Sequence, residues 1–181
     1  LYIKGVCQNI LVQQHVDQSA FFNRTWCEYK AGFGNTSGNF WLGNEQQHTL
    51  TQDNKYKLRF ELQSNTSGLS YWAEYDNFTV GDESTQYTLT VAGFSGNVTL
   101  DAMIQGYNLN GMKFSTKDRD NDNGGCNCAY DYGGGFWYNA CSYGYVNGAG
   151  GYFQWNYMGS SSSSSGSDFL LRTSRMWLVC R

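Results

Sequence analysis

The sequence predicts a single domain of the α+β class that covers residues 1–181. Three observations support this: short segments with strand-like patterns, a few helical segments too brief to stand alone, and a long polar stretch without periodicity. A chain of 181 residues with 40% hydrophobic and 15% charged positions can bury a core of ordinary size. Its 14 Tyr, 11 Phe and 6 Trp exclude an intrinsically disordered chain.

Strands are expected where polar and apolar residues alternate or where strand-favouring residues gather. Residues 57–62 alternate without a break, which a helix would not do. Aromatic and β-branched residues predict the other strands. These strands are 10–12, 71–75, 87–91 and 177–179.

Short helices are expected at 22–31, 45–50 and 98–105. Gly, Asn, Asp and Tyr dominate from about 106 to 168, and no periodicity persists there. Long loops on a rigid scaffold often carry function, so this segment is the expected location of a site. Within it, residues 159–167 form a Ser-rich insertion.

Charge and composition exclude several classes of function. A net charge of −3 argues against nucleic acid or anionic lipid as a partner. No run approaches the roughly 18 apolar residues of a membrane span. His15 and His48 lie outside the polar segment, and neither has a nucleophile at a recognised spacing. We therefore expect a protein that is not an enzyme.

Cysteines and glycosylation sequons favour an oxidising compartment. The six cysteines allow three disulfides in 15 possible pairings, and a CxC motif with two histidines falls short of a zinc pattern. Five N-x-S/T sequons precede residue 100, which predicts a secreted glycoprotein. The chain starts at Leu1 without a signal peptide, so we expect a processed or trimmed product. The sequon asparagines are Asn23, Asn35, Asn65, Asn77 and Asn97.

The densest polar cluster contains Asp118, Asp120 and Asp122. Carboxylates at alternate positions repel one another unless a cation or an arginine lies between them. Oxygen donors with this spacing, followed by glycines that let carbonyls turn inward, suit Ca²⁺, although the pattern is not an EF-hand. A solvated acidic turn that Arg119 partly neutralises is the alternative, and the spacing alone leaves both open.

Several segments, taken together and in order, resemble the fibrinogen-related domain. They span roughly residues 10–148. The segments are 17–22, 26–35, 40–44, 58–60, 114–122, 127–129, 137–138 and 147–148. The resemblance implies a twisted, mainly antiparallel sheet with short helices and a loop-rich calcium and ligand region.

The resemblance also implies a Ca²⁺ site. Its ligands would be the side chains of Asp120 and Asp122 and the carbonyl oxygens of Gly124 and Cys126. Asp118 would then lie beside the site or pair with Arg119.

A family disulfide is implied as well, and it corresponds to Cys128–Cys141. Cys7 and Cys180 lie near the two ends of the chain, and we expect them to be bonded. The remaining cysteines are either free or bonded to each other, which would tie the calcium loop to the first helix. The third bond would be Cys27–Cys126.

Lectin members of the family bind acetyl groups in a pocket beside the calcium loop. Here the corresponding pocket would include Tyr132 as an aromatic wall and a cis peptide between Ala140 and Cys141. Ser142 replaces the family's histidine. In fibrinogen the same pocket receives a peptide amino terminus through acidic side chains, a role that Asp131 could take.

The function expected from these features is a secreted, calcium-binding and non-enzymatic recognition module. Its ligand would be a carbohydrate or an acetylated compound, and Tyr130, Tyr138, Tyr143 and Tyr145 would be exposed for sugar stacking. The alternative is a structural subunit that packs against copies of itself in a glycosylated extracellular fibre or matrix.

Overall fold

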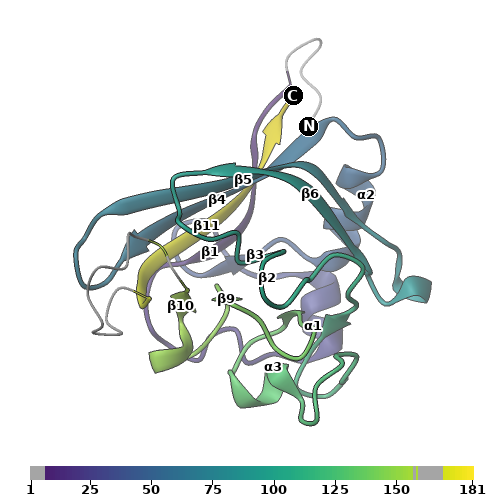
Figure 1. Ribbon diagram of the computed structural model, residues 1–181. Coiled ribbons are helices and arrows are strands. Elements are labelled where there is room, and N and C mark those ends of the chain that lie inside the picture. Colours follow the sequence, from purple (N-terminus) through teal and green to yellow (C-terminus); the bar gives the residue numbers. More distant parts are fainter. Residues whose placement is uncertain (1–6, 157, 159–168) are drawn as a thin grey trace.

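The computed structural model describes residues 7–156, 158 and 169–181. The predicted Ser-rich insertion at 159–167 lies outside these residues. The main sheet has seven strands in the order β2-β3-β1-β11-β4-β5-β6, and every pair in it is antiparallel (Figure 1). The α+β prediction is therefore confirmed.

The elements are short except for four strands of the main sheet. The seven strands of that sheet are β1 (Ile10–His15), β2 (Phe33–Gly34), β3 (Phe40–Trp41), β4 (Tyr56–Ser64), β5 (Ser70–Val80), β6 (Leu89–Gly96) and β11 (Leu171–Cys180). Two smaller sheets pair β7 (Phe114–Ser115) with β8 (Phe136–Trp137) and β9 (Gly144–Tyr145) with β10 (Gln154–Trp155). The helices are α1 (Trp26–Ala31), α2 (Asn44–Thr51) and α3 (Cys128–Asp131), with 3₁₀ turns η1 (Glu83–Thr85) and η2 (Gly150–Tyr152).

The last strand, β11, lies in the middle of the sheet between β1 and β4. It therefore brings the end of the chain beside its beginning, where Cys7 and Cys180 form the expected disulfide. The strand is longer than the predicted 177–179 because it pairs with β4 from Leu171 to Cys180.

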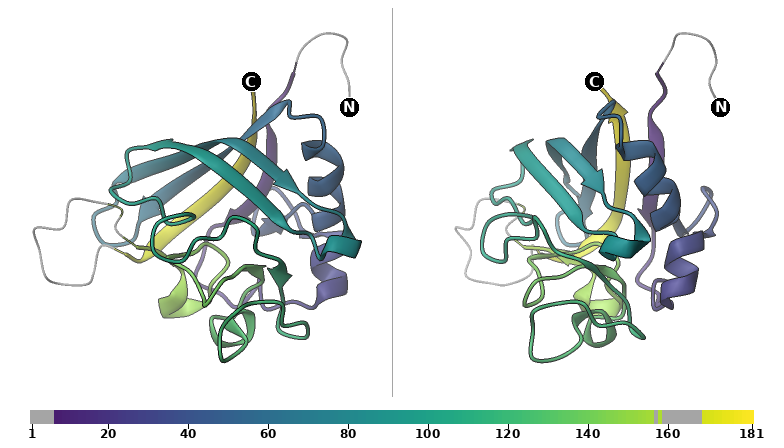
Figure 2. Two further views of the ribbon diagram at one scale, coloured as in Figure 1. Left: turned by 45° about the vertical axis from the view of Figure 1, so that its right-hand side comes forward. Right: turned by 90° about the vertical axis from the view of Figure 1, so that its right-hand side faces the viewer.

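Alternation along β4 separates the two faces of the sheet. Leu58, Phe60 and Leu62 are buried on the inner face, whereas Arg59 and Glu61 point to the outer face. In both views of Figure 2 the loop-rich part of the chain lies against one face of the sheet, with α1 and α2 at one side. Within the described residues, this part of the chain leaves the outer face of β4 and β5 uncovered.

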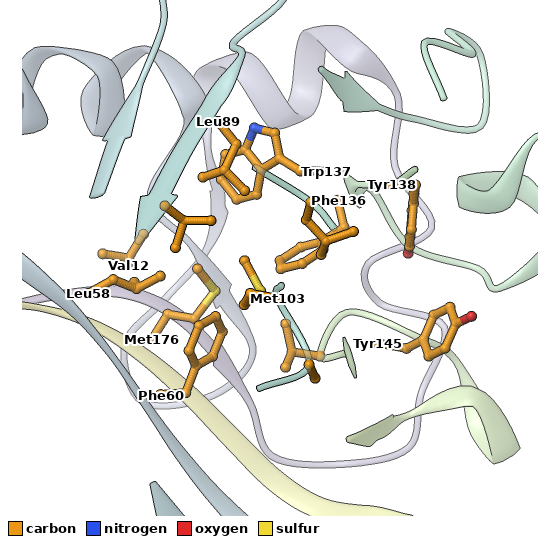
Figure 3. Close-up of a cluster of buried hydrophobic side chains, with 14 of the residues drawn as sticks. Val12, Leu58, Phe60, Leu89, Met103, Phe136, Trp137, Tyr138, Tyr145 and Met176 are labelled. Atoms are coloured by element: carbon orange, nitrogen blue, oxygen red, sulfur yellow. The ribbon is translucent and has the colours of Figure 1, made fainter. Parts of the chain in front are cut away.

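The loop-rich segment contributes its own side chains to the core. Figure 3 shows Phe136 and Trp137 of this segment, and Met103 just before it, together with Phe60 and Met176 of the sheet. These five side chains are at most 1% exposed. The segment is therefore anchored by burial of apolar surface, which is worth roughly 25 cal/mol per Å².

The predicted helix at 98–105 is wrong, because this segment forms turns. Oδ1 of Asp101 accepts the backbone N–H groups of Met103 and Ile104 and the hydroxyl of Tyr75. An aspartate that bonds nearby backbone groups in this way competes with helix formation.

Two other predicted boundaries shift for identifiable reasons. The helix predicted at 22–31 begins at Trp26, because Thr25 and Glu28 form a capping box there. The strand predicted at 87–91 begins at Leu89, because Tyr87 has a φ of 52°. No helix in the described part of the chain is long and apolar enough to cross a membrane.

Candidate functional site

The acidic turn predicted to bind calcium lies between β7 and α3. The N–H of Asp122 donates to Oδ1 of Asp120 at 3.2 Å. Oδ1 of Asp122 accepts the N–H of Gly124 at 2.8 Å, and Oδ2 accepts the N–H of Cys128 at 2.9 Å. Burial, followed by the charge of Asp120, raises the pKa of Asp122. The turn thus places two mutually repelling carboxylates together and ties one of them to the start of α3.

Oxygen atoms of the kind that calcium prefers converge beside Gly124. A Cβ atom added to this glycine would meet Oδ1 of Asp122 at 3.0 Å and the carbonyl oxygen of Cys126 at 3.2 Å. No group of three or more His, Cys, Asp or Glu side chains among the described residues could hold a metal ion. A cation here would therefore depend on backbone carbonyls as well as carboxylates. The donors fit Ca²⁺, and their assignment as ligands stays a prediction.

Asp118 contacts the first helix. Its Oδ1 accepts the N–H of Trp26 at 2.9 Å and the hydroxyl of Thr116 at 2.8 Å. Arg119 lies over the ring of Trp26, with its guanidinium carbon 4.1 Å from the ring centroid. Pairing with Arg119 was one of the two roles expected for Asp118; instead, both residues make separate contacts with the start of α1.

The Cys128–Cys141 disulfide closes the other side of this region. It links the first residue of α3 to the segment that leads into β9. Cys27 and Cys126, in contrast, are free and exposed, so the structure does not contain the third expected disulfide. A hydrogen bond with Asp131 raises the pKa of the Cys126 thiol.

Tyrosines gather next to α3. The ring of Tyr132 lies tilted against that of Tyr145, with ring centroids 4.4 Å apart, and meets the ring of Tyr152 edge-on at 4.9 Å. Tyr130 and Tyr152 are 69% and 49% exposed. We call Tyr130, Asp131, Tyr132 and Tyr152 the tyrosine surface. It presents exposed aromatic rings beside a carboxylate.

Two expectations about the pocket do not match the structure. All described peptide bonds are trans, including Ala140–Cys141, and Cys141 instead has a φ of 70°. Ser142 is buried, and its hydroxyl bonds the backbone of Gly144. The Tyr145 hydroxyl accepts the N–H of Ser142 from inside the fold. The side chain of Ser142 therefore faces the protein rather than a ligand.

The predicted set of exposed tyrosines also changes. Tyr138 and Tyr145 are 0% and 5% exposed and lie at the edge of the core, as Figure 3 shows. The hydroxyl of Tyr138 donates to the carbonyl of Gly134. Sequence reasoning missed Tyr152, whose only signal was its position in the Tyr- and Gly-rich segment.

All five sequon asparagines are exposed. Asn35 lies between β2 and β3, Asn65 between β4 and β5, and Asn97 directly after β6. Asn23 precedes α1, and Asn77 lies within β5. The fold therefore leaves each position accessible to modification.

The family of fibrinogen beta and gamma chains, C-terminal globular domain, matches residues 6–176. The chain belongs to this family. Angiopoietin-4 of Bos taurus is 38% identical over 178 residues, which cover 92% of the chain and 33% of the relative. The fibrinogen alpha chain of Homo sapiens is 44% identical over 151 residues, covering 77% and 17%. The chain thus spans a third or less of these relatives.

Solved structures agree with this membership. The fibrinogen-like globe domain of human ANGPTL2 has a TM-score of 0.79 and 33% identity, with 95% of this chain and 80% of that chain covered. Lamprey fibrin D-dimer, complexed with the peptide ligand Gly-His-Arg-Pro-amide, has a TM-score of 0.76 and 29% identity, covering 93% and 60%. The resemblance seen in the sequence is confirmed.

Proposed function

We propose that this fibrinogen-like domain is an extracellular, non-enzymatic recognition module that binds a peptide or protein partner at the tyrosine surface. The observation that carries the proposal is the exposure of Tyr130 in α3 and of Tyr152, whose ring meets the half-buried Tyr132. Large exposed aromatic side chains are characteristic of recognition surfaces, since they bury much area at little entropic cost. The carboxylate of Asp131 adds a negative charge to this surface.

The contacts of the pocket favour an amine over an acetyl group. The Ser142 hydroxyl and the Tyr145 hydroxyl are both occupied by backbone groups inside the fold. The carboxylate of Asp131 is exposed and, although it also bonds the Cys126 thiol, suits a cationic amino terminus. The lamprey fibrin D-dimer was solved with a peptide ligand, which supports this choice for a related chain.

Calcium would organise the neighbouring turn. Asp120 and Asp122, with the carbonyls of Gly124 and Cys126, would hold the ion, whose charge would offset the repulsion between the carboxylates. Oδ2 of Asp122 also accepts the N–H of Cys128, so an ordered turn would hold the first residue of α3 in place. Asp131 is the last residue of that helix, so the metal would act on the tyrosine surface through α3.

The two histidines support a role without catalysis. His15 is buried at the end of β1, and His48 lies in α2 with Nδ1 2.9 Å from the carbonyl of Val80. Neither histidine belongs to the tyrosine surface or the acidic turn. An acid–base group for hydrolysis would have to lie within hydrogen-bonding reach of the reacting atoms.

The test is an NMR titration of the glycan-trimmed chain with Gly-His-Arg-Pro-amide at saturating calcium. We expect shifts at Tyr130, Tyr132 and Tyr152 that the variant Asp131→Asn loses. The same peptide with an acetylated amino terminus is the matched control and should not bind. If N-acetylglucosamine or the acetylated peptide binds there instead, the surface recognises acetyl groups, and the amine proposal is wrong.

The calcium assignment is tested by titration calorimetry of the same chain. Asp122→Asn should abolish a calcium-binding signal, whereas Asp131→Asn should retain it. A wild-type chain that takes up no calcium at millimolar concentration would contradict the role of the acidic turn and leave peptide binding to be judged separately.

A second candidate function is assembly with copies of itself. It is favoured by the free, exposed thiols of Cys27 and Cys126, since a free thiol in a secreted protein can form bonds between chains. Non-reducing electrophoresis after air oxidation should then show dimers that Cys27→Ser/Cys126→Ser loses. A strict monomer in sedimentation at high concentration would exclude this candidate.

A further inference from the structure

The outer face of the main sheet has side chains that the proposed recognition function does not use. We define this outer face by Arg59, Glu61, Trp72, Glu74, Arg175 and Trp177. Arg59 Nη1 lies 3.3 Å from Glu74 Oε2, and Trp177 donates its indole N–H to Glu61 at 3.1 Å. Two cations and two carboxylates make the face electrically balanced, which favours a neutral, polar occupant over a charged one.

Strand register extends a row of side chains across this face. Arg175 pairs with Glu61, and Glu61 pairs with Trp72. The next position in that register on the β6 side is Asn97, whose N–H donates to the carbonyl of Trp72 at 3.1 Å. Directly opposed residues of antiparallel strands place their side chains on the same face, and Asn97, which directly follows β6, is held beside Trp72 because its Oδ1 accepts the Trp72 N–H. A sequon asparagine therefore ends a row that runs over Trp72.

A hydrogen bond, a close approach of the backbone and a cation–π contact fix the positions of Trp72 and Asn97. The N–H of Trp72 donates to Oδ1 of Asn97 at 2.6 Å, which leaves the amide nitrogen as the group to be modified. A Cβ atom on Gly96 would lie 2.6 Å from the Trp72 carbonyl oxygen, so the glycine permits the close approach of β6. Arg59 covers one side of the Trp72 ring, with its guanidinium carbon 4.7 Å from the centroid.

A shallow cavity of about 440 Å³ continues the row beyond Trp72. Its lining includes Glu61, Gln63 and Arg175, whose side chains offer both hydrogen-bond donors and acceptors. Three strand spacings separate Asn97 from Arg175, which is a distance of about 14 Å. An oligosaccharide that starts at Asn97 can therefore reach the cavity along the row.

We infer that an N-linked glycan on Asn97 packs over Trp72 and along the outer face of the sheet. This inference rests on the extracellular location in the proposed function but not on its ligand. In the attachment, C1 of the first N-acetylglucosamine bonds to the amide nitrogen. The lipid diphosphate donor leaves with the anomeric oxygen, and the displaced amide proton passes to solvent. The sugar then covers apolar indole surface and hydrogen-bonds the neighbouring polar side chains.

The test uses the full chain secreted from cultured mammalian cells, with occupancy of each sequon read by peptide mass mapping. In NMR spectra, the N-acetyl methyl of the first sugar on Asn97 should be shifted upfield by the Trp72 ring. The Trp72→Ala variant should lose this shift, and Trp177→Ala, which changes the other tryptophan of the face, should keep it. The glycan on Asn35, between β2 and β3, supplies the unshifted reference.

Fluorescence gives an independent readout. Trp72 and Trp177 are the two tryptophans that are not buried. In Trp177→Phe, Trp72 is therefore the tryptophan that a quencher in solution can reach. Enzymatic removal of the glycans should increase acrylamide quenching in Trp177→Phe, and Asn97→Gln in that background should abolish the increase. An unmodified Asn97, or an occupied Asn97 with neither effect, overturns the inference. If Trp72 is instead protected by added free oligosaccharide, the face is an external carbohydrate site.

Discussion

His15 is a buried, ionisable side chain at the end of β1. Its ring is 0% exposed, stacks on Phe153 at 3.9 Å and lies 4.7 Å from the ring of Phe22. Nδ1 lies 3.0 Å from the carbonyl oxygen of Val146, and Nε2 has no hydrogen-bond partner among the described residues. Burial lowers the pKa of His15 from 6.5 to about 4, against smaller opposite effects of the Val146 carbonyl and the charge of Asp17. The fold therefore holds this histidine neutral.

The first prediction is a loss of stability in mild acid. The unfolded chain binds a proton on His15 near pH 6.5, whereas the folded chain does so only near pH 4. Neutral His15 therefore makes its full contribution to the free energy of unfolding above pH 6.5. This contribution falls by about 3 kcal/mol in total as the pH falls toward 4. Urea unfolding between pH 7 and pH 4 measures it.

The control for His15 is His15→Phe, which keeps an aromatic ring against Phe153 and Phe22. The carbonyl of Val146 also accepts from Gln13 and Ser174, so it keeps partners in this variant. The variant should show a flatter pH dependence over the same range. Equal pH dependence of both proteins would mean that other groups dominate.

At the scale of elements, α1 depends on a residue from the acidic turn. Its first N–H, that of Trp26, has no partner within a six-residue helix and is accepted by Asp118 instead. The second prediction is that Asp118→Ala lowers the free energy of unfolding by about 1–2 kcal/mol without calcium. Asp120→Ala is the control, since the bond of Asp120 seen among the described residues is with the N–H of Asp122 in the same turn. Similar losses in urea unfolding would refute the special role of Asp118.

The segment after α3 packs so closely on the turn after β9 that a side chain cannot fit. A Cβ atom on Gly134 would lie 1.9 Å from the carbonyl oxygen of Asn147. The third prediction is that Gly134→Ala destabilises the domain by about 1–3 kcal/mol through overpacking. Gly151→Ala is the control, because nothing lies within 4 Å of its Cβ position, and we expect a change of less than about 0.5 kcal/mol. Thermal unfolding distinguishes the two variants.

At the scale of the whole molecule, one disulfide connects the ends of the described chain. Cys7 and Cys180 are 173 positions apart, and a loop of this length restricts the unfolded state strongly. The fourth prediction is that Cys7→Ser/Cys180→Ser lowers the free energy of unfolding by about 3–5 kcal/mol. Denaturant unfolding is the measurement. Cys27→Ser/Cys126→Ser removes two free thiols and should leave stability nearly unchanged; a comparable loss there would show that these thiols are bonded.

The class of fold, the family and most of the long strands can be predicted from the amino-acid sequence. Alternation at 57–62 located β4 because side-chain direction along a strand is a local property. Residue type and spacing also placed the acidic turn and the five sequons, and the positions of Cys7 and Cys180 near the chain ends predicted their bond. The Cys128–Cys141 bond was implied by the resemblance to the fibrinogen-related domain.

The tertiary structure sets the direction of side chains in segments where the sequence has no periodicity. It turned Ser142 inward, left Cys27 and Cys126 unbonded, and joined Asp118 to α1 across a sequence separation of 92. It also placed Asn97 opposite Trp72 through the pairing of β5 with β6. Such contacts depend on the path of the chain between distant residues, and local composition carries no information about that path.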